Sequence, residues 1–122
     1  MDKIRYDGDF VRGLYHGRGN LAYFVGDKYD GDFFKGKRQG KGVLSFKMKT
    51  GEDSGQQFYE WYEGEWFNDK YEGWGVYSHS TKGVIYRGNW RLGRRHGQGH
   101  YRVEDKPDLV EGVFCDGDIF QM

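Results

Sequence analysis

The sequence predicts an all-β protein: a single-layer, twisted antiparallel sheet in which stacked β-hairpins follow one another as a meander, with solenoid-like repetition. Three observations support this prediction. One five-residue motif recurs along the chain, aromatic and polar residues alternate within it, and a Gly-x-Gly pair follows each full copy. Because a fixed short period is the signature of repeat architectures, the repeat decides the fold class.

The repeated motif places an aromatic residue, a glycine and a second aromatic residue at alternate positions. Units start at about residues 6, 29, 62, 86 and 110, so that successive starts lie 23, 33, 24 and 24 residues apart. We expect one repeat domain over residues 1–122, with an insertion at about residues 47–58. The copies are Tyr6–Phe10, Tyr29–Phe33, Tyr62–Trp66, Tyr86–Trp90 and the diverged, partial copy Val110–Phe114.

Alternation makes each copy of the motif a strand. Side chains of a strand point to opposite faces in turn, so the rings share one face and the acidic or polar residues share the other. Gly31, between Tyr29 and Phe33, leaves bare backbone on which a ring can lie. We therefore expect an aromatic-on-glycine ladder along the sheet. Bulges or turns are the alternative role for these glycines.

A glycine-bounded segment follows each first strand, and we expect it to form the hairpin turn because glycine reaches positive φ without steric cost. Asp69 replaces the first of these glycines in the third unit. Alternation then resumes in a second strand, for example with Leu21 and Tyr23, so each full unit is a predicted hairpin. The turn segments are Gly13–Gly17, Gly36–Gly40 and Gly93–Gly97.

Two departures from the period bear on function. The second unit carries extra residues between Val43–Met48 and Phe58–Trp61, which we expect to form a protruding polar tip. Such a tip is either a binding loop or a tolerated surface loop. The last unit stops after its first strand, so we expect open sheet edges near Tyr6 and near the carboxyl end. Unpaired edges invite partners, including a second copy of the chain.

Composition narrows the function classes. Hydrophobic residues make up 36% of the chain and aromatic residues 19%, which leaves too few aliphatic residues for a two-layer sandwich. The 19 basic and 19 acidic residues cancel, which argues against nucleic-acid binding. Cys115 is the single cysteine, and no membrane-spanning run or secretion signal is found in the sequence. We expect a cytoplasmic protein.

The motif and its period resemble the MORN repeat (membrane occupation and recognition nexus). Tyr62–Trp66 with Gly73–Gly75, and Tyr29–Phe33 with Gly40–Gly42, are near-complete copies of that pattern. The resemblance implies sheets of stacked hairpins that have no activity of their own. They serve as scaffolds in cilia, flagella and other cytoskeletal structures, or as modules attached to enzymes. A small stand-alone chain is most similar to the radial-spoke-like axonemal members.

We therefore expect a non-catalytic protein–protein interaction scaffold, a component of a cytoskeletal or axonemal assembly. The sequence shows no catalytic motif, no metal-ligand spacing and no cofactor motif, and we expect the repeated acid pairs, such as Asp7 and Asp9, on a solvated face. Some rings are expected to face a partner, although they must also hold the fold together. These rings are Tyr29, Phe33, Tyr62, Trp66, Tyr86 and Trp90.

Basic residues gather in the turns, which stacked hairpins would place along one rim. Such a rim could bind acidic phospholipids, so a peripheral membrane adaptor is the first alternative function; the charges could equally serve only to solvate the loops. The second alternative is a regulatory subunit of an enzyme carried by another chain. The candidate rim residues are Lys35, Lys37, Arg38, Arg91, Arg94 and Arg95.

Overall fold

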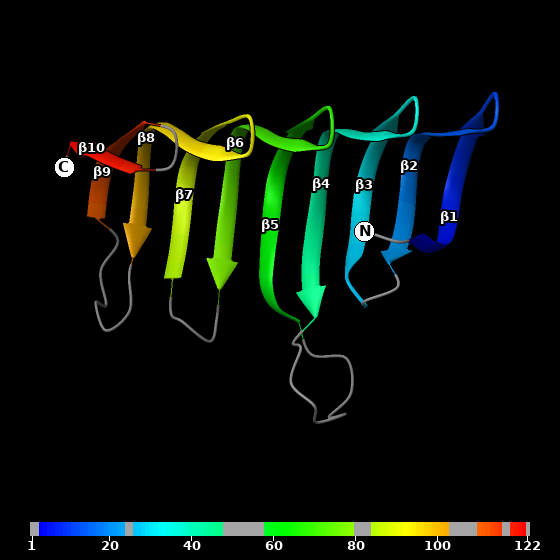
Figure 1. Cartoon of the computed structure of the whole chain (residues 1–122), viewed down its shortest axis with the longest axis horizontal. Coiled ribbons are helices and arrows are strands. Elements are labelled where there is room, and N and C mark those ends of the chain that lie inside the picture. The colour runs from blue at the N-terminus through cyan, green and yellow to red at the C-terminus, as the bar shows by residue number, and fades with distance from the viewer. Residues whose placement is uncertain are drawn as a thin grey trace.

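The computed structural model describes residues 3–23, 26–47, 58–79, 84–102, 110–115 and 118–121. They form one ten-stranded antiparallel sheet in which every strand pairs with the next along the chain (Figure 1), and these residues contain no helix. The predicted meander is confirmed, but the expectation that the last unit stops after its first strand is wrong, because Asp118–Gln121 forms a further strand that pairs with Val110–Cys115. The strands are β1 (Lys3–Val11), β2 (Leu14–Tyr23), β3 (Lys28–Phe34), β4 (Lys37–Lys47), β5 (Phe58–Phe67), β6 (Lys70–His79), β7 (Val84–Arg91), β8 (Arg94–Arg102), β9 (Val110–Cys115) and β10 (Asp118–Gln121).

The predicted insertion falls between β4 and β5. These two strands pair along their length, from the Gly40–Trp66 pair to the Lys47–Phe58 pair. The predicted protruding tip, residues 48–57, lies outside the described residues.

Each of the first four hairpins closes with a two-residue turn. Both turn residues have positive φ, for example 52° at Arg12 and 80° at Gly13, as in the type I′ turn whose twist matches that of paired strands. The predicted turn Gly13–Gly17 is therefore too long, because Leu14–Gly17 already belongs to β2. The same correction applies to Gly36–Gly40 and Gly93–Gly97.

A bulge in the second strand bends each of these hairpins. The neighbouring pairs Gly8–Gly19 and Phe10–Tyr15 leave three residues of β2 opposite a single residue of β1. Gly17 lies in this bulge with φ of 80°, a conformation that costs glycine little. Bulges bend a strand and increase its twist. The turn end of each hairpin therefore bends away from the direction of the strands, along the upper edge of Figure 1. The equivalent bulge glycines are Gly40, Gly73 and Gly97.

The bent ends, which we call the folded tips, are residues 10–16, 33–39, 66–72 and 90–96. They cover the aromatic face of the sheet. Tyr15 stacks on Tyr6 with ring centroids 3.9 Å apart, and Tyr71 stacks on Tyr62 at 3.8 Å with the rings parallel within 1°. The folded tips thus supply the second layer that a single sheet lacks.

An unbroken row of glycines crosses the aromatic face. The Tyr29 ring and hydroxyl occupy the space that a Cβ on Gly42 would need, and a Cβ on Gly31 would overlap the Gly42 backbone. The same hydroxyl donates a 2.8 Å hydrogen bond to the carbonyl of Asp32. The predicted aromatic-on-glycine ladder is confirmed, and these glycines are neither bulges nor turns. The row comprises Gly8, Gly19, Gly31, Gly42, Gly64, Gly75, Gly88, Gly99 and Gly112.

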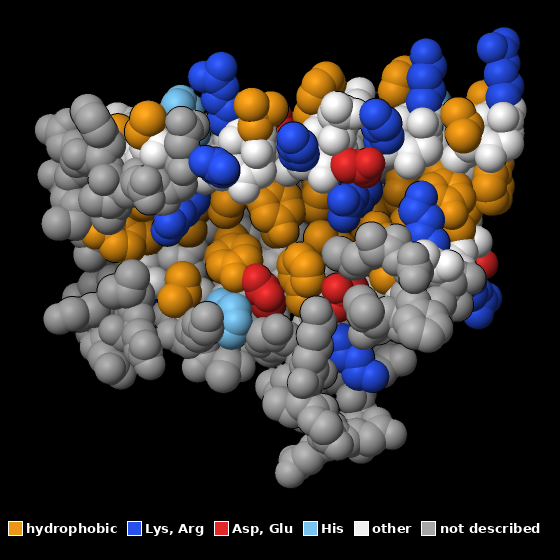
Figure 2. All heavy atoms as spheres, viewed as in Figure 1, with side chains coloured by type: hydrophobic (Ala, Val, Ile, Leu, Met, Phe, Trp, Pro, Cys, Tyr) orange, Lys and Arg blue, Asp and Glu red, His pale blue; other side chains and the backbone are white. Residues whose placement is uncertain are grey.

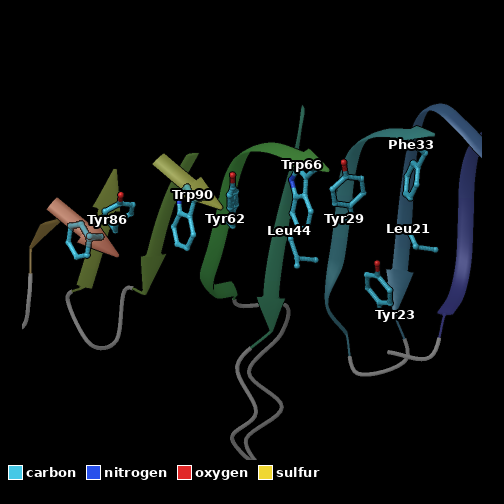
Figure 3. Packing of buried hydrophobic residues seen from close by; sticks show 10 residues of the cluster. Leu21, Tyr23, Tyr29, Phe33, Leu44, Tyr62, Trp66, Tyr86 and Trp90 are labelled. Atoms are coloured by element: carbon cyan, nitrogen blue, oxygen red, sulfur yellow. The ribbon is translucent and has the colours of Figure 1, made fainter. Parts of the chain in front are cut away.

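The core is a line of side chains along this face. Figure 3 shows these side chains spread along successive strands rather than gathered at one point. Neighbouring rings meet edge to face, as Trp90 does with Tyr86 at 5.1 Å and with Tyr62 at 5.4 Å between centroids. Burial of each large ring contributes about 2–3 kcal/mol. The buried hydrophobic residues are Leu21, Tyr23, Tyr29, Phe33, Leu44, Tyr62, Trp66, Tyr86, Trp90 and Phe114.

Hydrogen bonds join successive hairpins through the tips. The N–H of Gly36 donates to the carbonyl of Tyr15 in the preceding hairpin at 2.8 Å, and the indole N–H of Trp66 donates to the carbonyl of Gly42 at 3.0 Å. The fourth hairpin repeats both contacts, from Gly93 to Tyr71 and from Trp90 to Gly75. Neighbouring tips are therefore held at a fixed spacing.

We predict that Gly42→Ala lowers the free energy of unfolding by about 2–3 kcal/mol, because the added methyl group displaces the Tyr29 ring from the backbone. Urea unfolding followed by circular dichroism measures the loss. Gly93→Asn is the control, because a Cβ at position 93 would meet no atom within 4 Å and Asn tolerates the φ of 84°. Equal losses in the two variants would contradict the ring-on-glycine packing.

Candidate docking surfaces

The six rings predicted to face a partner lie in the core. Their exposed fractions run from 0% for Tyr29 and Tyr62 to 7% for Trp90. The expectation of an exposed aromatic face is therefore wrong, because the rings must leave water to hold a single-layer sheet together. The residues concerned are Tyr29, Phe33, Tyr62, Trp66, Tyr86 and Trp90.

Two of the predicted rim cations, Arg38 and Arg95, pack against the rings. The guanidinium carbon of Arg38 lies 4.7 Å from the Trp66 ring centroid, and that of Arg95 lies 5.0 Å from the Phe114 centroid. Such a position over a ring face is favourable for a cation. These arginines occupy the tip positions that tyrosines hold in the first and third hairpins, so the rim available for binding is smaller than predicted.

Asp69, the residue that replaces a turn glycine, serves this packing. The turn is kept, since Asp69 has φ of 69° and Asn68 has φ of 51°. The Asp69 carboxylate accepts hydrogen bonds from the backbone N–H of Arg38 at 2.9 Å and from its Nε at 3.1 Å. The side chain of Asp69 therefore fixes the arginine that covers Trp66.

The remaining rim cations share the outer edge of the folded tips with exposed apolar side chains. Figure 2 shows Lys and Arg side chains standing among hydrophobic ones along the upper edge of the molecule. We call this set the tip edge. Its cations are Arg12, Lys35, Lys37, Lys70, Arg91 and Arg94, all exposed. Its apolar residues, 43–61% exposed, are Val11, Leu14, Phe34, Phe67 and Leu92.

Sequence reasoning identified the cations of the tip edge but not its apolar residues. The last cross-strand pair before each turn faces away from the rings, and it reads Val11–Leu14, Phe34–Lys37, Phe67–Lys70 and Arg91–Arg94 along the chain. A signal was available, because the residue directly after the second aromatic position falls on the opposite face from the ring.

The tip edge is locally basic in a chain of zero net charge. The folded tips contain eight Lys and Arg residues and two acids, Asp69 and Glu72. Both acids are engaged: Asp69 pairs with Arg38, and Glu72 accepts the backbone N–H of Leu92 at 3.2 Å. The edge therefore presents net positive charge, which attracts acidic partners.

The repeated acid pairs divide into two roles. The carboxylate of Asp32 accepts the backbone N–H of Lys41 at 3.0 Å, and that of Glu65 accepts the N–H of Trp74 at 2.6 Å. Both N–H groups adjoin a bulge glycine, so the second acid of the motif stabilises the bend. The predicted solvated face applies to the first acids, Asp7, Asp30 and Glu63, which are exposed.

A hollow of 470 Å³ opens on the aromatic face beside Trp90. Tyr77 donates a hydrogen bond to the Glu60 carboxylate on one wall. Burial, and then the negative charge of Glu60, raise the pKa of Tyr71 to about 12. The hollow is lined by Glu60, Tyr71, Tyr77, His79, Val84, Tyr86, Trp90, Gly93 and Arg95.

Two kinds of site are absent from the described ranges. No three His, Cys, Asp or Glu side chains among these residues are grouped so that they could hold a metal ion. No helix in this part of the chain is long and apolar enough to cross a membrane.

The family model of the MORN repeat matches residues 6–28, 29–50, 62–84 and 86–104. The chain belongs to the MORN-repeat family. The matched segments cover most of the strands of the first four hairpins, and β9 continues the same glycine row beyond them. The MORN repeat is a non-enzymatic module that generally binds proteins or membranes. Among the curated proteins searched, none matches this chain.

The buried tyrosines predict a loss of stability at high pH. Burial is the main cause that raises the pKa of Tyr29, Tyr62 and Tyr86, and it raises that of Tyr71 to about 12, whereas an unfolded tyrosine titrates near 10. The unfolded chain therefore loses protons first, so the stability is complete below about pH 10 and falls as the pH rises towards 12.

Thermal melts between pH 8 and pH 12, with absorbance at 295 nm, measure this effect. We expect the melting temperature to fall above pH 10 while part of the tyrosine absorbance change is delayed to higher pH. A single titration of all tyrosines near pH 10 with an unchanged melting temperature would contradict the assignment.

Proposed function

We propose that this MORN-repeat chain is a non-catalytic docking scaffold of a cytoskeletal or ciliary axonemal assembly, and that it binds an acidic protein partner along the tip edge. The observation that carries this proposal is the combination of exposed apolar side chains and cations at each of the four folded tips. Exposed aromatic residues and arginine are favoured at protein interfaces, and a positive edge selects acidic partners.

The outer face of the sheet is a weaker candidate for the docking surface. Its charges compensate one another, as Arg18 shows by lying 3.3 Å from the Asp32 carboxylate and 3.8 Å from that of Asp30. The folded tips cover most of the aromatic face and leave the hollow beside Trp90 open. The outer face also exposes an apolar ring, Trp74, at 49%. Among the described residues, however, only the tip edge combines uncompensated charge with apolar side chains such as Phe34 and Phe67, 43% and 55% exposed.

The cytoskeletal and cytoplasmic setting is supported by the family resemblance and by the shape of the molecule. Repeated contact points along one edge suit an elongated partner better than a small ligand. An enzyme regulated by this chain would also appear among the captured proteins, and so would a second copy of the chain bound at a sheet edge.

Affinity capture from extracts of ciliated cells tests the proposal. The tip variant carries Lys35→Glu, Lys37→Glu, Arg91→Glu and Arg94→Glu, and the outer-face control carries Lys41→Glu and Arg87→Glu. We expect the tip variant to capture at least tenfold less of the acidic axonemal or cytoskeletal proteins than the wild type does. The control should capture as much of them as the wild type. Capture that is equal for the wild type and the tip variant would reject the tip edge as the binding site.

A membrane is the second candidate, favoured by the alignment of the tips along one edge (Figure 2). A flat anionic surface could meet all four tips at once, with Phe34 and Phe67 entering the headgroup region. Co-sedimentation with vesicles tests this. We expect binding that requires anionic lipid, weakens with salt and falls at least fivefold in the Phe34→Ser/Phe67→Ser variant. Identical binding to neutral and anionic vesicles would eliminate the candidate.

A further inference from the structure

The tip edge is periodic, and its period can be derived from the strand order. Neighbouring strands of a sheet lie about 4.8 Å apart, so successive tips, two strands apart, repeat at about 9.6 Å. The repeat of contacts such as Gly36 to Tyr15 and Gly93 to Tyr71 keeps this spacing. The four tips therefore form a strip of about 30 Å.

Each period of this strip offers at least one exposed apolar side chain and one or two exposed cations. The second tip presents Phe34 with Lys35 and Lys37, and the fourth presents Leu92 with Arg91 and Arg94. A partner that fits the strip must bring one apolar contact and one or two acids about every 10 Å, on one side.

An α-helix meets this requirement when its sequence has a heptad period. A helix rises 1.5 Å per residue, so seven residues advance about 10.5 Å. The mismatch with the tips is about 1 Å per period, which flexible Lys and Arg side chains can absorb. Heptad helices carry apolar residues at positions a and d and charges at e and g, which is one apolar and one charged set per period.

An extended segment fits less well. A polyproline helix, at about 9.3 Å per three-residue turn, matches the spacing but turns only one side chain per turn towards the tips, too few for both an apolar and an acidic contact. A β-strand fails on the direction of its side chains. At about 3.3 Å per residue, its side chains would have to recur every three residues to match the tips. Residues three apart on a strand point to opposite faces, so only alternate tips would be served.

We propose that the tip edge docks a helical segment of a partner protein, one heptad to each tip, with apolar a and d residues on Phe34, Phe67 and Leu92 and acidic e or g residues on the tip cations. This inference rests on the proposed docking function and defines the form of the partner.

The tip edge also gives the helix a direction. Its terminal pairs change from Val11–Leu14 in the first hairpin to Arg91–Arg94 in the fourth. The first tip has one exposed cation, Arg12, and the fourth has two, Arg91 and Arg94, so the carboxyl end of the helix, with its negative dipole, is favoured at the fourth tip rather than at the first.

Three synthetic peptides of four heptads test the proposal by fluorescence anisotropy and circular dichroism. The first has Leu at a and d and Glu at e and g; the second has the same composition in scrambled order; the third places Glu and Pro at a three-residue period, which favours a polyproline helix. We expect the heptad peptide to bind at least tenfold more tightly than the other two and to gain helix on binding.

The variants separate this inference from the proposed function. The Lys35→Glu/Lys37→Glu/Arg91→Glu/Arg94→Glu tip variant should lose the heptad peptide, and the Lys41→Glu/Arg87→Glu control should retain it. A nitroxide on the carboxyl end of the heptad peptide should broaden amide signals of residues 90–96 more than those of residues 10–16.

If heptad and scrambled peptides bind equally and only the tip variant loses them, the helix is rejected while acidic docking survives. If the third peptide binds best, the partner is extended. If no acidic peptide distinguishes the tip variant from the control, both inferences fail.

Discussion

The stability of this sheet depends on a tyrosine ring that lies flat on bare backbone. In each of the first four hairpins, a tyrosine such as Tyr62 covers a cross-strand pair of glycines and bonds a carbonyl three residues further on. A single sheet has no second layer under which to bury its rings, so the cover must come from the hairpin itself. The glycines remove the side chains that would hold the ring away, and the bulge folds the tip back over the ring.

The same constraint decides which side chains remain for binding. The aromatic residues of the second, third and fourth motifs lie in the core, whereas Phe10 of the first motif is 56% exposed. The second acids, such as Glu65, hold the bend through backbone N–H groups. The residue before each turn neither packs in the core nor holds the bend. Its identity accordingly differs between hairpins, from Val11 to Phe34, Phe67 and Arg91. The surface that can differ without cost to the fold is the one that carries apolar and basic groups to the outside.

Departures from the repeat compensate one another. Arg38 stands where the first and third hairpins place a tyrosine, and Asp69 stands where the other hairpins place a turn glycine. The two residues meet, with the Arg38 Nε 3.1 Å from the Asp69 carboxylate and the Asp69 N–H bonded to the Arg38 carbonyl at 3.0 Å. An ion pair with hydrogen bonds therefore holds the junction between the second and third hairpins. In the next junction, the stacked ring of Tyr71 and the turn glycine Gly93 take the places of Arg38 and Asp69.

The sequence by itself determined the period, the strand alternation, the glycine ladder and the family resemblance. These are local patterns, since residues two apart on a strand share a face and Tyr29, Gly31 and Phe33 therefore reveal their common side. What only the tertiary structure decided was which residues are covered. A bulge glycine such as Gly17 and a sheet glycine such as Gly19 look the same in one dimension, yet the first bends the hairpin and the second receives a ring. That bend buries the six rings expected to face a partner, turns Arg38 towards Trp66 and leaves Phe67 outside, because burial depends on what folds over a residue and not on the residue alone.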